Sequence, residues 1–510
     1  MNKMAYVLGI DIGTSGTKTV LFDEAGGVMA SHTAEYPLYQ PENGWAEQNP
    51  EDWWQAAAET VRAVLGKCSV RPQEIRGIGL SGQMHGLVML DKDNRVLRPS
   101  IIWCDQRTGE QCEEIEEKVG KKRLIEITAN PALTGFTASK ILWVRSYQPE
   151  IYEKCAHILL PKDYIRFKLT GEYATEVSDA SGMQLLDVPG RRWSQEVLDR
   201  LEIDRGLLGH VYESPEATGT VSREAAALTG LTEGTPVVGG AGDNAAAAVG
   251  TGVVRPGRAF TTIGSSGVVF AHTDAIRIDS LGRVHTFCCA VPGCWHVMGV
   301  TQGAGLSLKW LRDNFCGPEL EQAAREGVDP YLVMDREAAK VPIGSERLIY
   351  LPYLMGERTP HLDPEARGVF FGLSAMHGRP QLIRAVMEGV SFSLMDCLGI
   401  FYEMGIPVDS MIACGGGGSS LLWRQMLSDV YNCPISTITS KEGPALGAAI
   451  LAMVGAGIYP SVEEACDGVI RRHSTQEPSA EHHQRYMHFY ERYCALYPVL
   501  KEQYKYLSRL

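Results

Sequence analysis

The sequence lacks the features that mark membrane, secreted and disulfide-stabilised proteins. It has no uninterrupted apolar run long enough to span a bilayer, and its N-terminus has no charged segment followed by an apolar stretch and a small-residue cleavage site. Its 13 cysteines form no CxxC pair, which favours reduced core thiols over a disulfide framework. We therefore expect a cytoplasmic protein that does not bind membranes.

An excess of positive charge is also missing. The chain has 48 Lys and Arg against 61 Asp and Glu, a formal net charge of −13. This balance argues against nucleic acid as the main partner. A small anionic cofactor remains compatible with it, because local loops and a metal ion can bind such a group. At 510 residues the chain exceeds one hydrophobic core, so two large domains are expected.

The commonest phosphate-binding loops are absent as well: there is no Walker A spacing and no GxGxxG after a strand. Instead, DIGTSGTKTVLF (11–22) predicts two strands joined by a Gly-rich turn in which Thr14, Ser15 and backbone N–H groups could face phosphate. A plain β-hairpin with a permissive turn is the alternative. Asp11, at the end of an apolar strand, would be costly to bury unless it met a cation such as the Mg²⁺ of a nucleotide.

A second turn of the same design occurs in AFTTIGSSGVVF (259–270), where glycines again alternate with hydroxyl residues between two strands. Two such turns in corresponding places predict a duplicated domain, with the turns gripping one nucleotide between them. We place the boundary in the small-residue stretch 237–257. The two domains then comprise residues 1–245 and 246–510.

Helix and strand signals alternate in both halves, which predicts an α/β fold. Helical spacing covers 50–68 and 379–405, and short buried strands are expected at 76–82 and 410–418. The stretch 442–457 is expected to be a close-packed helix with structural alanines, and the last fifty residues look helical and polar.

Asp243 is the strongest candidate for catalysis. It follows a strand and flexible glycines in GGAGDNAAAAVGTG and begins an alanine-rich helix. The glycines would let a substrate approach this carboxylate, which is ionised at neutral pH and suits a general base. A helix N-cap is the structural alternative.

Two loops could bind a polyhydroxylated substrate. In SGQMHGLVML (81–90), His85 could hydrogen-bond hydroxyls while Met84 packs on a carbon face; a satisfied loop histidine is the alternative. In IIWCDQRTGEQ (101–111), Trp103 and Asp105 could line a pocket, or be a core aromatic and a helix cap. The cap is the favoured interpretation for Asp105.

A third glycine turn, in CGGGGSSLLWRQMLSD (414–429), leads into a helix. A helix N-terminus offers free N–H groups, and the missing side chains leave a flat surface for an adenine ring or a ribose. The simple alternative, a strand-to-helix turn, would need fewer than four consecutive glycines.

Together these motifs resemble the FGGY family of carbohydrate kinases over nearly the whole chain. The motifs that carry the likeness are DIGTSGTK, GQMHG, LLPKDYIRFKLTGE, GAGDNAA, TIGSSG, LPYLMGERTPH, GVFFGL followed by RAVMEG, and CGGGG. The resemblance implies two actin-like, RNase-H-like ATPase domains with an interdomain cleft that holds ATP, and a ketose deep in the first domain. The order and spacing are most similar to family members that phosphorylate D-xylulose on its C5 hydroxyl.

The resemblance also implies roles for individual residues. Asp243 would be the catalytic base, Met84, His85 and Asn244 would hold the sugar, Asp11 would face Mg²⁺, and Thr14, Ser15, Gly264, Ser265, Gly305, Gly416 and Gly417 would bind ATP. The local pattern around Trp103 and Asp105 adds these two residues to the candidate sugar pocket.

Three departures from the family pattern bear on sugar specificity and nucleotide affinity and leave the base and metal positions unchanged: Cys104, Ser265 and the pair Ser419 and Ser420. The alternatives are a sister kinase for ribulose, gluconate or another polyol, and a non-catalytic actin-like nucleotide switch. Oligomeric state is left open, with a homodimer as one option.

Overall fold

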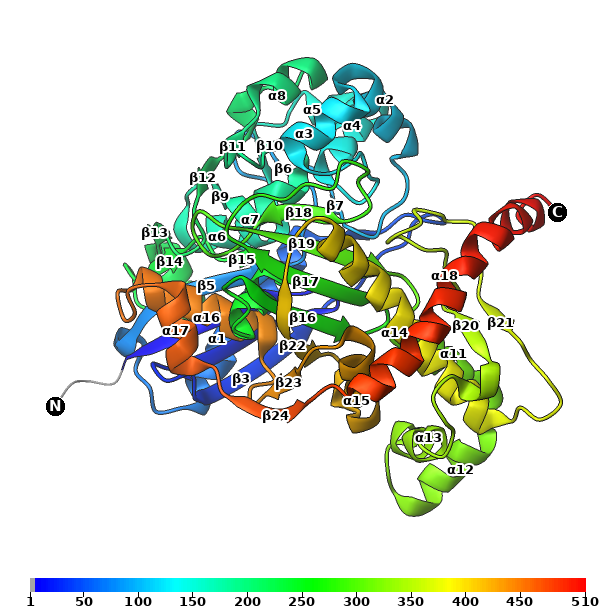
Figure 1. Ribbon diagram of the computed structural model, residues 1–510. Coiled ribbons are helices and arrows are strands. Elements are labelled where there is room, and N and C mark those ends of the chain that lie inside the picture. The colour runs from blue at the N-terminus through cyan, green and yellow to red at the C-terminus, as the bar shows by residue number, and fades with distance from the viewer. Residues whose placement is uncertain (1–4) are drawn as a thin grey trace.

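The computed structural model describes residues 5–510, which form two α/β domains, each built on a seven-stranded sheet (Figure 1). In spatial order the first sheet comprises β13 (Ala217–Thr220), β14 (Pro236–Val238), β5 (Ile75–Gly82), β1 (Tyr6–Ile12), β2 (Gly16–Asp23) and β3 (Val28–Glu35), with β15 (Ala241–Gly242) paired to β5. The second comprises β18 (His285–Cys288), β19 (Trp295–Thr301), β17 (Gly267–Thr273), β16 (Gly257–Ile263), β22 (Val408–Cys414), β23 (Ile435–Ile438) and β24 (Arg472–Gln476).

The two sheets repeat one topology. In the first, β1 and β2 are antiparallel, β2 and β3 are antiparallel, and β5 and β14 continue the sheet parallel to β1. The same senses relate β16, β17, β19, β22 and β23 in the second. The predicted duplication is therefore confirmed, and the two Gly-rich turns occupy equivalent positions.

Both turns are true hairpin turns between buried strands. The first closes with the Gly13 N–H donating to the carbonyl of Gly16 at 3.0 Å. A Cβ on Gly16 would lie 2.7 Å from the carbonyl oxygen of Ala34 in β3, so glycine is what lets the third strand approach. The residue that corresponds to Asp11 in the second hairpin is Thr262, so a carboxylate stands beside the first turn alone.

The predicted helices are confirmed with small shifts at their ends. α1 (Pro50–Lys67) begins after Asn49, whose side chain caps it. α14 (Arg379–Glu403) is the only helix within residues 5–510 that is long and apolar enough to cross a membrane. Of its most apolar window, 78% is buried inside the fold, as in a core helix.

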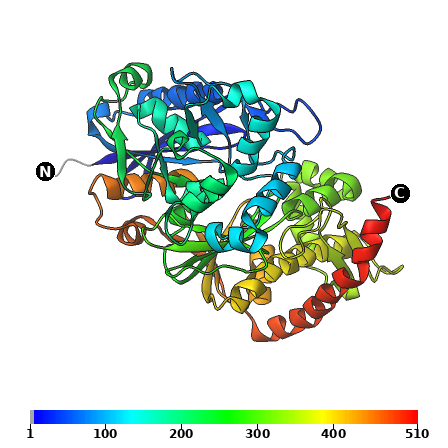
Figure 2. The same ribbon diagram turned by 90° about the horizontal axis from the view of Figure 1, so that it is seen from above.

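α16 (Gly443–Gly455) lies between β23 and β24 of the second sheet in the chain but packs against the first sheet, on β1 and β5. In both views the orange segment that contains it lies between the blue and green sheets (Figures 1 and 2). A Cβ on Gly9 or Gly79 would overlap a backbone carbonyl of this helix. The helix can lie this close because the strands present glycines to it and its own facing residues are alanines, which the sequence predicted to be structural.

The remaining helices cover the sheets and form the outer parts of each domain. They are α2 (Gly109–Val119), α3 (Lys121–Thr128), α4 (Thr137–Tyr147), α5 (Pro149–Tyr152), α6 (Pro161–Thr170), α7 (Val177–Ala180), α8 (Gln195–Leu201), α9 (Arg223–Thr229), α10 (Asp243–Gly250), α11 (Gly305–Phe315), α12 (Gly317–Glu326), α13 (Pro330–Ala338), α15 (Leu421–Tyr431), α17 (Val462–Val469) and α18 (Ala480–Leu507). Short strands complete the fold: β4 (Glu47–Gln48), β6 (Val88–Leu90), β7 (Ser100–Ile101), β8 (His157–Leu159), β9 (Ala174–Glu176), β10 (Leu186–Asp187), β11 (Arg192–Trp193), β12 (His210–Tyr212), β20 (Ile349–Leu351) and β21 (Val369–Phe371).

The edge hairpin of the second sheet, β18 and β19, docks on the first domain. Asn130 donates its side-chain amide to the carbonyl of Thr286 at 2.9 Å, and the N–H of Cys288 donates to the hydroxyl of Ser181 at 3.0 Å. All 13 cysteines are free thiols and six of them are buried, so the expected burial in the core holds for about half.

Candidate active site

Asp243 is the first residue of α10, directly after β15. Gly242 holds the N-cap position without a side-chain hydrogen bond, so the alternative that Asp243 caps the helix is wrong. Its carboxylate instead accepts the N–H (2.7 Å) and the side-chain amide (3.0 Å) of Asn244. Burial, and then the charge of Asp11, raise the pKa of Asp243 to about 6. This carboxylate is ionised at neutral pH yet basic enough to take a proton.

The glycines before Asp243 serve the protein rather than leaving space for a substrate. A Cβ on Gly242 would lie 2.8 Å from Cγ and 3.0 Å from Sδ of Met84. Gly240 has φ +70°, and a Cβ there would overlap the carbonyl of Leu80 in β5. The glycines thus let the loop that carries Met84, and also β5, pack closely against the segment that leads into Asp243.

His85 is fixed by its backbone and by one ring nitrogen. Its φ is +70°, and its Nδ1 lies 2.8 Å from the carbonyl oxygen of Gly182. A carbonyl only accepts hydrogen bonds, so Nδ1 carries the proton and Nε2 is left as an acceptor. Burial and the charge of Lys140 lower the pKa of His85 to about 3, which keeps the ring neutral. The satisfied-histidine alternative therefore holds for one nitrogen, and the other can accept a hydroxyl.

Lys140, on α4, is a site residue that the sequence did not reveal. Its fully buried ammonium donates to the carbonyls of His85 (2.9 Å) and Gly135 (2.6 Å). Burial lowers its pKa to about 7. A single lysine within a helix carries no motif, so only the fold could show that it holds the His85 loop in place.

Trp103 links the two predicted regions of the site. Its side chain is 41% exposed, so the core-aromatic alternative is wrong, and its indole N–H donates to the hydroxyl of Thr14 at 2.9 Å. The loop that carries Trp103 is therefore bonded to the first Gly-rich turn.

Asp105 lies two residues beyond Trp103, and its carboxylate is fully buried. It accepts hydrogen bonds from the side chain of Arg107 (Nε at 3.0 Å, Nη2 at 2.7 Å), from the backbone N–H of Arg107 at 2.9 Å and from the N–H of Ala46 at 2.6 Å. The favoured cap interpretation is wrong, because α2 begins after Thr108 and has no side-chain cap. Arg107 in turn stacks on Trp45, 3.6 Å from the ring centroid.

Asp11 stands at the end of β1, near Asp243. It accepts the hydroxyl of Ser81 at 2.8 Å. Burial raises the pKa of Asp11, against the opposing effects of Ser81 and of the charge of Lys18. Its charge also raises the pKa of Asp243, so two carboxylates lie close enough to repel each other. Oxygen ligands with uncompensated negative charge fit Mg²⁺.

The second Gly-rich turn lies at the end of β16, together with the start of α11 and the third glycine turn. The N–H groups of Gly305 and Leu306 at the start of α11 donate to the carbonyls of Gly264 (2.7 Å) and Ser265 (3.1 Å). A Cβ on Gly305 would lie 2.5 Å from that oxygen of Gly264, so this contact requires glycine. The Ser265 side chain is exposed beside it.

The third glycine turn packs on the same strand end. A Cβ on Gly417 would lie 2.5 Å from the side chain of Ile263. The neighbouring Gly416 is exposed, with open space where its Cβ would be. Ser420 caps α15 through its hydroxyl. The structure thus brings Gly264, Ser265, Gly305, Gly416 and Gly417 together. No hydrogen bond joins this group to the first hairpin within residues 5–510.

A buried ionic cluster lies behind Asp243 and was also missed. Lys162 Nζ is 2.8 Å from Asp163, 3.6 Å from Glu176 and 3.5 Å from Asp179, all on side chains that are at most 1% exposed. Burial raises the pKa of Asp179, and the charge of Asp243 adds to the rise. The motif LLPKDYIRFKLTGE contains the lysine, but its partners lie in β9 and α7, which sequence spacing does not connect.

Arg358, in the second domain, lies near the loop that carries Met84 and His85. Its charge lowers the pKa of both His85 and His285. The preceding residue, Glu357, is buried, which raises its pKa to about 7, and it accepts the hydroxyl of Thr301 at 2.7 Å. The motif LPYLMGERTPH carried this segment in the sequence without indicating a role.

Comparison with known proteins identifies the family. Residues 6–250 match the N-terminal domain of the FGGY family of carbohydrate kinases, and residues 259–456 match its C-terminal domain. The chain belongs to this family. It is 40% identical to the xylulose kinase of Bacillus subtilis (strain 168) over 499 residues, 98% of each chain. It is 35% identical to the gluconokinase of the same strain over 488 residues, 95% of this chain and 94% of that one.

Solved structures agree with this assignment. The ligand-bound xylulose kinase of Lactobacillus acidophilus has a TM-score of 0.91 and 27% identity, covering 99% of this chain and 100% of the other. The resemblance inferred from the motifs and the two-domain α/β fold are both confirmed. As a member of this family, the kinase transfers phosphate from ATP to a sugar hydroxyl. The alternative of a non-catalytic nucleotide switch is set aside.

Proposed function

We propose that this kinase transfers the γ-phosphoryl group of ATP to the C5 hydroxyl of D-xylulose, with Asp243 as general base. The observation that carries the proposal is the position of Asp243, which directly follows Gly242, the residue packed on Met84, and lies close enough to Asp11 for the charge of Asp11 to raise its pKa. Similarity over nearly the full chain to xylulose kinases supports the choice of sugar. Gluconate is the second candidate, because the gluconokinase of Bacillus subtilis is 35% identical.

Asp243 orients the acceptor hydroxyl and takes its proton. The hydroxyl oxygen forms the new bond to the γ-phosphorus while the bond from phosphorus to the ADP oxygen breaks, and the proton passes to the carboxylate. Phosphoryl transfer has a loose transition state, so most of the acceleration comes from alignment. His85 accepts a sugar hydroxyl at Nε2, Met84 packs on the carbon chain, and Asn244 and Trp103 complete the pocket. Asp105, whose buried carboxylate is bonded to Arg107 and Ala46, supports the Trp103 loop rather than contacting the sugar.

The ATP site is proposed on the two turns. Thr14 and Ser15 would face the γ-phosphate, Gly264 and Ser265 the phosphates from the other side, and Gly305, Gly416 and Gly417 the nucleoside. Asp11 would hold Mg²⁺, which when bound neutralises charge on the phosphate oxygens.

These placements assign the two proposed binding sites to different domains. We place the domain boundary between residues 245 and 246, with the sugar site in the first domain and the nucleotide site in the second. A cytoplasmic location suits a kinase that uses ATP. A homodimer remains the simplest assembly to test, by light scattering.

The variant Asp243→Asn tests the proposal. We expect kcat to fall about 10²- to 10⁴-fold while D-xylulose still binds, because the amide keeps the shape and loses the base. The matched control is Asp329→Asn, since Asp329 caps α13 away from the site and asparagine caps equally well. ADP release is measured with D-xylulose, D-ribulose and gluconate.

Near-normal turnover in Asp243→Asn would remove Asp243 from the mechanism. A higher kcat/KM for gluconate than for D-xylulose in the wild-type enzyme would instead replace the sugar and leave the general base in place.

A further inference from the structure

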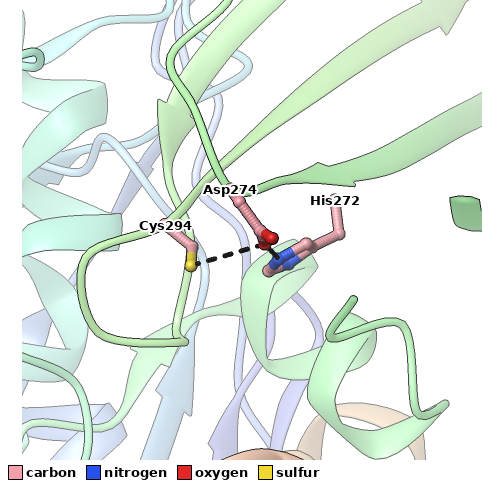
Figure 3. Close-up of side chains that lie close together, drawn as sticks. All are labelled: His272, Asp274 and Cys294. Carbon is pink, nitrogen blue, oxygen red and sulfur yellow. Dashed lines mark hydrogen bonds and ion pairs between the residues drawn. The ribbon is translucent and has the colours of Figure 1, made fainter. Parts of the chain in front are cut away.

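A cluster of metal-ligand side chains lies at the end of the second sheet, outside the active site. His272 in β17, Asp274 just after it, and Cys294 just before β19 each present a ligand atom, and these atoms lie within 4.8 Å of one another (Figure 3). His272 Nε2 is 3.0 Å from Asp274 Oδ1, and Cys294 Sγ is 3.8 Å from the same oxygen.

These separations suit a tetrahedral ion. Bonds of about 2.0 Å from zinc to nitrogen or oxygen and about 2.3 Å to sulfur place two nitrogen or oxygen ligand atoms roughly 3.3 Å apart, and a sulfur roughly 3.5 Å from either of them. The mixture of one thiol, one imidazole and one carboxylate also favours zinc over Mg²⁺ or Ca²⁺, which prefer oxygen alone. Small side-chain rotations suffice to reach the ideal geometry.

The surroundings of His272 resemble those of a metal-binding histidine. Its Nδ1 lies 3.8 Å from the sulfur of Cys289, whose own thiol donates to the carbonyl of Val291 at 3.4 Å. The second ring nitrogen of a metal-bound histidine is normally occupied by such an outer partner. Cys289 would therefore fix the ring so that Nε2 faces Asp274 and Cys294.

The cluster is held in place by neighbouring residues, and one of its side chains is open to solvent. His272 is 2% exposed, whereas the side chain of Asp274 is 64% exposed, so an ion can enter from solvent without opening the core. The turn that carries Cys294 is held against the first domain, because Arg191 donates to the carbonyl of Cys294 at 2.7 Å. Arg191 is itself paired with Glu213 at 2.6 Å, which offsets its positive charge near the site.

We propose that His272, Asp274 and Cys294 bind one zinc ion, with Cys289 as the outer partner of the histidine and water in the fourth position. The site lies away from the active site. His272 is five residues along β17 from Gly267, or about 17 Å from the phosphate turn. The ion would join β17 to the turn between β18 and β19, on the side that docks on the first domain.

Zinc binding to the reduced, chelator-treated full-length enzyme tests this proposal. We expect one Zn²⁺ per chain in competition with a chromogenic chelator, and a thiolate charge-transfer band when Co²⁺ is added instead. Asp274→Asn and Cys294→Ser should each weaken zinc binding at least tenfold, and Cys289→Ser about 10- to 100-fold. Cys494→Ser, at an exposed cysteine outside the cluster, should bind zinc like the wild type.

Zinc should also raise the melting temperature of the wild type and of Cys494→Ser but not of Asp274→Asn, with kinase activity unchanged in all three. Asp274→Asn alters an exposed side chain, so it decides the question if Cys294→Ser fails to fold. The proposal is overturned if the wild type shows no saturable binding, if Asp274→Asn binds zinc as tightly, or if Cys289 and Cys294 form a disulfide in the isolated protein.

Discussion

The indole N–H of Trp103 donates a hydrogen bond of 2.9 Å to the hydroxyl of Thr14. This bond joins the loop proposed to contact the sugar to the turn proposed to contact the γ-phosphate. Because one bond links the two regions, the position of each depends on the other.

Trp103→Phe keeps an aromatic ring and removes this donor. A neutral hydrogen bond contributes about 0.5 to 1.5 kcal/mol, so we expect the KM values for sugar and for ATP to rise together, by about 2- to 10-fold. Steady-state kinetics with each substrate varied in turn measures both. A rise confined to the sugar would show that the bond does not couple the two regions. Trp310→Phe, on α11, is the matched control.

The pH dependence of turnover should report the titration of Asp243. Its pKa is raised to about 6, and a general base acts only when deprotonated, so kcat should fall as the pH drops through about 6. His85, with a pKa lowered to about 3, stays neutral throughout this range and should not contribute. The measurement is kcat at saturating substrates from pH 5 to pH 8. A flat acidic side, or a kcat that rises as the pH drops through about 6, would contradict the assignment.

Lys140→Met should damage the sugar site more than the ATP site. The change leaves the carbonyls of His85 and Gly135 without their buried donor, at a cost of about 1 to 3 kcal/mol each. We expect a lower free energy of unfolding in urea and about a tenfold higher KM for the sugar, with the KM for ATP little changed. Lys122→Met is the control, because that side chain is 92% exposed. Unchanged sugar affinity would show that Lys140 does not position His85.

Gly242→Ala should weaken sugar binding, whereas Gly79→Ala should lower the stability of the fold. In Gly242→Ala the new Cβ meets Met84, a flexible side chain that can move, so the fold should survive and the KM for the sugar should rise several-fold. In Gly79→Ala it overlaps the backbone carbonyl of Ala448, which cannot move without shifting α16, so a loss of more than about 3 kcal/mol is expected. Thermal melts and sugar titrations separate the two. Equal stability of both variants would contradict this distinction.

The sequence predicted the duplicated sheets and both turns, because glycines with alternating hydroxyl residues between apolar strands are local signals. It also predicted that Asp243 begins a helix. The sequence did not reveal which residues pair with one another when the pairing arises only because both are buried in the fold. Asp105 was taken for a cap, although Arg107, two residues away, pairs with it once both are buried.

Residues that act through the fold were missed for the same reason. Lys140 and Lys162 are single lysines in helices, and their partners come from loops and strands that sequence spacing does not connect. The glycines near Asp243 were correctly singled out. These positions require glycine because Met84 and β5 lie against them, and this tertiary contact could not be predicted from the sequence.

The placement of α16 has a consequence for biosynthesis. The glycine-lined face of the first sheet receives its covering helix from residues near the other end of the chain. During translation, that face therefore stays uncovered until the ribosome has passed residue 455 of 510. A nascent chain that stops earlier exposes apolar surface and is a substrate for chaperones or for aggregation. The first domain to be made is thus among the last to be finished.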